Sequence, residues 1–179
     1  MNLSCKTNLP SNRLNTSILQ GEILITTRNH SSWGGGVTAE MYLPLQRSQL
    51  WEKLTDYPRW VHYFPDLSQS EVLQIAVNQG CKRLYQVASK AFFLFTAQVE
   101  VYLKVFEQFQ QQIQFRLEKG SFQDFSADLK LQDYHTGTLL TYSVQATPII
   151  PIPTALIQQA MLLDLPNNMR QMRQVLIKH

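Results

Sequence analysis

The segment QIQFRLE, residues 112–118, alternates polar and apolar side chains without interruption. Side chains two residues apart share one face of a β-strand, so this pattern predicts a strand with one dry and one wet face. FSADLKLQ (residues 125–132) and TLLTYSVQAT (residues 138–147) repeat the pattern, and the longer segment 95–109 precedes it. These segments predict a fold built on strands.

Turn-forming residues separate the alternating segments. NQG lies at residues 78–80, KG at 119–120 and HTG at 135–137, and each is typical of a tight turn. Residues 68–77 and 81–89 add two candidate strands before the long one. Because the connections are short, consecutive strands are expected to pair as an antiparallel meander.

An earlier pair of strands is expected at residues 22–29 and 37–43. They flank HSSWGGG (residues 30–36), whose glycines suit a hairpin or bulge. No Gly-Lys-Ser/Thr follows these glycines, so the motif is not that of a phosphate-binding loop. The sheet is expected to hold about seven strands in all.

Helical spacing of apolar residues appears twice. Pro44 is expected in the first turn of a helix that ends before Pro58, with a second short helix at residues 59–63. After the proline-rich connector PIIPIP (residues 148–153), a long C-terminal helix is expected over residues 155–177. Thr154 is its candidate N-cap, and Pro166 should bend it near Asp164.

The expected fold class is therefore α+β: a helix-grip domain, in which a curved antiparallel sheet wraps a long C-terminal helix. Residues 21–179 form this single domain, and residues 1–20 are expected to be a disordered tail. In a chain of 179 residues, the 44% that are hydrophobic suffice for one sizeable core.

Composition excludes several other classes. A net charge of +3 without a basic cluster argues against a nucleic-acid partner. Cys5 and Cys81 lie far apart, which favours free thiols and predicts neither a disulfide nor a metal site. No apolar run approaches ~20 residues. A cytoplasmic protein without a cofactor is expected.

Six short motifs now resemble those of START-like (SRPBCC) domains. The resemblance is nearest to the polyketide cyclase/dehydrase and coenzyme Q-binding group, in the variant found in cyanobacteria and plastids. The order of the motifs along residues 35–178 is more specific than any one of them. They are LWEKLTDY at residues 50–57, FPDL at 64–67, SEV at 70–72, GSFQDF at 120–125, LLTY at 139–142 and DLPNNM at 164–169.

This resemblance implies a cavity between the sheet and the C-terminal helix that holds a hydrophobic molecule such as a lipid, quinone or polyketide. The family would show Gly-x-Trp where this chain has Ala127-Asp128-Leu129, and loss of the Trp would enlarge or reshape the interior. The alternative is that the inward residues pack solidly. The expected lining is Phe95, Ala97, Val99, Val101, Ile113, Phe115, Leu117, Phe125, Ala127, Leu129, Leu140, Tyr142 and Val144 from the sheet, and Leu156, Ile157, Ala160 and Met161 from the helix as its lid.

An aromatic segment lies beside the expected mouth of the cavity. Tyr57, Trp60, Tyr63 and Phe64 are predicted to form a portal, which could also touch a membrane surface to collect a lipid. The alternative is that these rings cap the core.

Three functions are compatible with the sequence. The favoured one is a non-enzymatic carrier of a hydrophobic small molecule. An enzyme of the aromatase/cyclase kind needs converging titratable groups, whereas the inward positions offer only Tyr142 and Tyr85. His62 and Asp66 could form a general base but are more typical of a local surface contact. No catalytic residue is therefore predicted. A protein-interaction module with a filled core is the third function.

Overall fold

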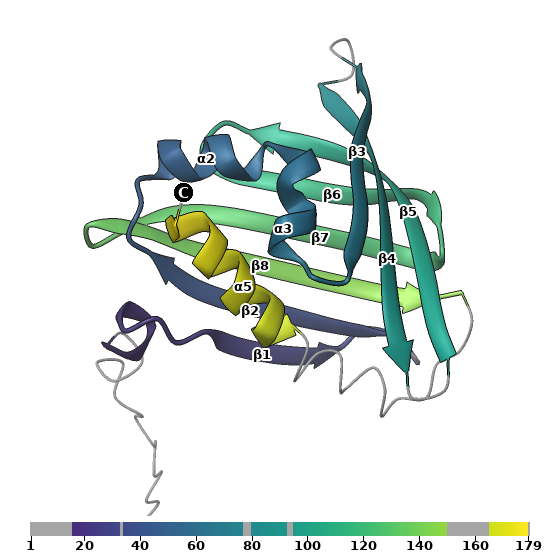
Figure 1. Ribbon diagram of the computed structural model, residues 1–179, viewed down its shortest axis with the longest axis horizontal. Coiled ribbons are helices and arrows are strands. Elements are labelled where there is room, and N and C mark those ends of the chain that lie inside the picture. Colours follow the sequence, from purple (N-terminus) through teal and green to yellow (C-terminus); the bar gives the residue numbers. More distant parts are fainter. Residues whose placement is uncertain (1–15, 33, 77–79, 93–94, 150–164, 179) are drawn as a thin grey trace, which may run out of the picture.

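The computed structural model describes residues 16–32, 34–76, 80–92, 95–149 and 165–178. Within these ranges the chain forms one curved antiparallel sheet with its helices gathered on one side (Figure 1). The α+β helix-grip class expected from the sequence is confirmed.

The sheet has eight strands rather than about seven, because every segment with a strand pattern joins it. Its spatial order is β1-β2-β8-β7-β6-β5-β4-β3, so β1 and β3 are the edges and β2 meets β8. The strands are β1 Leu24–Asn29, β2 Gly35–Leu43, β3 Leu67–Ala76, β4 Cys81–Phe92, β5 Phe95–Gln108, β6 Gln112–Gly120, β7 Phe122–Tyr134 and β8 Gly137–Pro148.

The described helices lie over the concave face of the sheet (Figure 1). They are α2 Arg47–Leu54, the 3-10 turn η1 Tyr57–Arg59, α3 Trp60–Tyr63 and α5 Leu165–Lys178. Met169, Met172 and Leu176 recur at helical spacing and are buried against the sheet side of α5. The second half of the predicted C-terminal helix is thus core packing.

Five local expectations need correction or fall outside the description. Pro44 precedes α2, because the hydroxyl of Thr138 donates to the carbonyl of Leu45 at 2.7 Å and the extended residue Gln46 is the N-cap. Residues 16–19 of the expected tail form a helical turn, and Ile18 is buried. Strand β7 begins at Phe122, three residues before the expected start at Phe125. The bend at residue 164 and the N-cap Thr154 lie outside the described residues.

Within the part of the chain that the structure describes, no helix combines the length and the apolar character needed to cross a bilayer.

Candidate ligand-binding site

The concave face of the sheet is packed at one end. Leu129 on β7 and Leu140 on β8 are fully buried, as is Ile113 on β6. The backbone register places Ile113 beside Leu129, and Leu129 beside Tyr142, so these residues share one face across three strands. Helices α2, α3 and α5 complete the core here. Any ligand must therefore lie elsewhere on the face.

The other end of the concave face is only half buried. We call this set of residues the open end. Its members lie on β5 to β8, where they alternate with outward residues. All are apolar, and each side chain is half buried. They are Val99, Leu117, Phe122, Phe125 and Val144. Apolar surface that folding leaves partly unburied is available to an apolar molecule.

Tyr142 lies on β8 between the packed end and the open end. Its side chain is 7% exposed, and its hydroxyl makes no hydrogen bond with the residues that the structure describes. Burial raises the pKa of the Tyr142 phenol above its usual value of 10.0. The hydroxyl therefore stays protonated at neutral pH and can donate a hydrogen bond.

Aromatic rings surround Tyr142. The ring centroid of Phe64 lies 6.0 Å from that of Tyr142, and Phe64 stacks on Trp60 at 5.6 Å. Trp60 in turn lies 5.0 Å from Phe115 on β6. The aromatic rings of Trp60 on α3 and of Phe64 just after it therefore pack on the concave face beside Tyr142.

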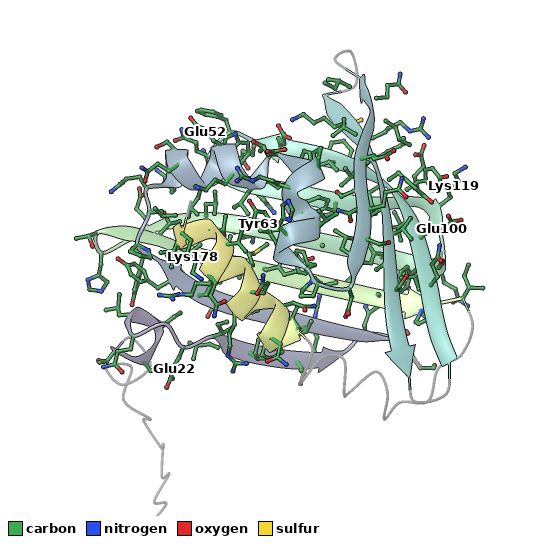
Figure 2. The ribbon with its side chains drawn as sticks, viewed as in Figure 1. Glu22, Glu52, Tyr63, Glu100, Lys119 and Lys178 are labelled. Atoms are coloured by element: carbon green, nitrogen blue, oxygen red, sulfur yellow. The ribbon has the colours of Figure 1, made fainter. Side chains whose placement is uncertain are left out.

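The predicted portal residues have mixed positions. Tyr57, Trp60 and Tyr63 are buried in the hydrophobic core, and Figure 2 shows Tyr63 extending from α3 over the sheet. Their polar atoms are used locally: the Trp60 indole donates to the Leu54 carbonyl at 2.9 Å, and the Tyr63 hydroxyl to the Lys53 carbonyl at 3.0 Å. For these three residues the placement matches the alternative reading, in which the rings cap the core. Phe64 alone among the four is partly exposed.

The predicted lining residues divide into three groups. Those buried on the concave face are Val101, Ile113, Phe115, Ala127, Leu129, Leu140 and Tyr142. Those half buried are Val99, Leu117, Phe125 and Val144. The side chains of Phe95 and Ala97 and the whole of Leu156, Ile157, Ala160 and Met161 lie outside the described residues, so the lid stays a prediction.

The inward polar residue on β4 differs from the one expected. Tyr85 lies on the outer face, where its hydroxyl donates to Glu100 at 2.9 Å and its ring packs on Tyr102. Gln86 takes the inward position on β4, and its amide donates to the Ser70 hydroxyl at 3.1 Å. The parity of the strand could have revealed this, because Gln86 is two residues from the buried Leu84.

A cleft of about 470 Å³ lies between α3 and α5. His62 lines it together with Arg59 and Gln171, whose amide donates to the His62 carbonyl at 3.5 Å. His62 is exposed, so its ring belongs to this outer cleft and not to the concave face.

The described residues contain no group of three His, Cys, Asp or Glu side chains arranged to hold a metal ion. Their buried polar residues are Ser70, Thr138 and Thr147, all neutral. Each is hydrogen-bonded, Ser70 to the Tyr57 carbonyl at 2.7 Å and Thr147 to Ser31 at 2.8 Å. These three hydroxyls therefore have partners within the described part of the chain.

An antiparallel sheet curved around helices, with an apolar concave face that is half open at one end, defines a START-like protein of the helix-grip class. The family model described as "Polyketide cyclase / dehydrase and lipid transport" matches residues 43–173, which is more than half of the chain. The chain therefore belongs to this family, and the resemblance seen in the sequence is confirmed. None of the curated proteins compared with the chain matches it.

Solved structures show the same fold. A STAR-related lipid transfer protein fragment from Xanthomonas axonopodis superposes with a TM-score of 0.67 at 18% identity, covering 86% of this chain and 93% of that one. A protein from Thermus thermophilus gives 0.65 at 17%, covering 80% and 94%. The Zhui aromatase/cyclase from a Streptomyces species gives 0.63 at 12%, covering 81% and 92%. At these identities the likeness establishes the fold alone.

Proposed function

We propose that this protein binds and carries a hydrophobic small molecule, of the lipid, quinone or polyketide-like kind, without changing it chemically. The ligand lies on the concave face of the sheet, over the open end. The family to which the chain belongs has lipid transport in its description, which supports this assignment.

The observation that carries the proposal is the change in burial along the concave face. Leu140 and Leu129 are fully covered by the helices, whereas Val144 and Phe125, on the same two strands and the same face, are not. Both ends are equally apolar. An apolar ligand over the open end would gain roughly 25 cal/mol for each Å² of apolar surface removed from water.

Native mass spectrometry of protein purified without detergent tests the proposal directly. The expected result is a species heavier than the chain by the mass of one small molecule, which organic extraction then releases. Protein that is free of ligand and takes up none from a panel of lipids, quinones and aromatic polyketides would contradict it.

Filling the open end should abolish the binding. Val144→Trp places a large ring where Val144 is half buried, and we expect at least a tenfold loss of affinity for whatever ligand the wild type binds. Gln145→Trp is the matched control, because Gln145 is the next residue on β8 and contacts Arg28 on the outer side. Equal affinities of the two variants would place the ligand elsewhere. Circular dichroism checks that both variants fold, since overpacking costs typically 1–3 kcal/mol.

A second candidate is an enzyme of the aromatase/cyclase kind, favoured by the words cyclase and dehydrase in the description of the family. The two functions differ in what happens to a bound polyketide mimic. A carrier returns it with its mass and absorption spectrum unchanged after incubation, whereas a cyclase returns a dehydrated aromatic product.

A further inference from the structure

The Tyr142 hydroxyl differs from the other buried donors of the core. Tyr57 donates to the Glu107 carboxylate at 2.5 Å, Tyr63 to a backbone carbonyl and Trp60 to another. No fully buried side-chain nitrogen or oxygen among the described residues lacks a partner. The Tyr142 hydroxyl makes no hydrogen bond with another described residue, although its side chain is only 7% exposed. Among these donors, the hydroxyl of Tyr142 is therefore the one open to a partner beyond the described residues.

Leaving such a hydroxyl without any partner would be costly. A buried donor without a partner destabilises the folded protein by about 1–3 kcal/mol. Phenylalanine would fill the same volume on β8 without that cost, and the neighbours Phe64 and Leu140 are apolar. The hydroxyl is explained if an acceptor outside the described residues, such as a ligand oxygen, takes its hydrogen.

We propose that Tyr142 is the polar anchor of the site, and that its hydroxyl donates a hydrogen bond to a carbonyl-type oxygen of an otherwise apolar ligand. This inference rests on the proposed function and names the ligand class: an apolar body with one acceptor oxygen. Raised by burial, the pKa of the phenol keeps the donor protonated at neutral pH.

The geometry also orients the ligand. Tyr142 lies at the boundary of the packed end, whereas Val144 and Phe125 lie toward the open end on β8 and β7. The acceptor oxygen therefore points inward, beside Phe64, and the apolar body extends over the open end. A ligand without an acceptor leaves the hydroxyl unpaired and gains only from burial.

The test uses two probes of nearly equal shape, 2-acetylnaphthalene and 2-isopropylnaphthalene, of which only the first carries an acceptor oxygen. Affinities for wild type and for Tyr142→Phe are measured by equilibrium dialysis at neutral pH. We expect Tyr142→Phe to weaken 2-acetylnaphthalene by about three- to tenfold, which corresponds to one net hydrogen bond. Binding of 2-isopropylnaphthalene should change by less than twofold.

Tyr85→Phe is the matched control, because it removes the same hydroxyl from the outer face. It should leave both affinities unchanged. If Tyr142→Phe changes the two probes alike, the hydroxyl is not an anchor and is served by water instead. If wild type binds neither probe, the proposed function fails and this inference with it. If it binds both with no effect of Tyr142→Phe, the inference alone is overturned.

Discussion

Gly120 ends β6 with a backbone φ of +143°, a conformation that residues with a side chain rarely adopt. A Cβ here would lie 2.3 Å from the Glu100 carbonyl oxygen on β5 and 2.9 Å from the Cα of Val101. The next residue, Ser121, donates its backbone amide to the same carbonyl at 2.9 Å. The turn is therefore held against β5 by contacts that only glycine permits, and it brings Phe122 to the open end.

Gly120→Ala should destabilise the protein by more than the ~1–3 kcal/mol expected for backbone strain alone, because the obstructing atoms are backbone. Gly80→Ala is the matched control: Gly80 also has a positive φ, +61°, but no heavy atom lies within 4 Å of its Cβ position. Its cost should stay near 1–2 kcal/mol. Urea unfolding measures both, and equal midpoints would contradict the role assigned to the Glu100 carbonyl.

Helix α5 holds the sheet and the short helix α3 together through its buried face. Its buried residues Met169, Met172 and Leu176 face β2 and α3, and Arg173 donates to the Tyr42 carbonyl of β2 at 3.3 Å. The described part of the helix thus packs on one half of the concave face.

Met169→Ala should lower the free energy of unfolding by about 2–5 kcal/mol, since it removes a fully buried side chain from this contact. Gln174→Ala, on the exposed side of the same helix, should change it by less than ~0.5 kcal/mol. Chemical denaturation of the two variants gives the comparison. Similar losses for both would mean that α5 contributes little through its buried face.

For the whole molecule, three buried phenols connect stability to pH. Burial raises the pKa of the first, Tyr63, above its usual value. Burial raises the pKa of Tyr142, and burial together with the hydrogen bond to Glu107 raises the pKa of Tyr57, each from a usual 10.0. Above pH 10 the unfolded chain releases these protons whereas the folded chain keeps them. Alkaline pH therefore favours the unfolded state.

The free energy of unfolding should hold steady up to about pH 9.5 and then fall as the pH rises through 10 to 11.5. Each retained proton contributes a slope of about 1.4 kcal/mol per pH unit. Tyr142→Phe should lower this slope by about 1.4 kcal/mol per pH unit, the contribution of one proton. Lysines contribute equally to both proteins, so the comparison cancels their effect. Urea unfolding at each pH measures the slopes. An unchanged slope in the variant would show that Tyr142 ionises freely in the folded protein.

The sequence by itself determined the strands, their faces and the family. Alternation with a period of two is a local property, so it placed Ile113, Phe115 and Leu129 on the concave face without knowledge of their partners. The order of the motifs indicated the family correctly. The sequence reading placed Tyr85 on the inward face of β4, but the inward residue there is Gln86. The alternation was read one residue out of step.

Only the tertiary structure decided which part of the concave face is filled. Leu140 and Val144 are both inward positions of the same alternating strand. Leu140 is fully buried, whereas Val144 is half buried. The difference arises because helices distant in sequence cover one end of a curved sheet. The approach of Phe64 to Tyr142 is also a long-range contact. Burial and hydrogen-bond satisfaction depend on such contacts, which no local period encodes.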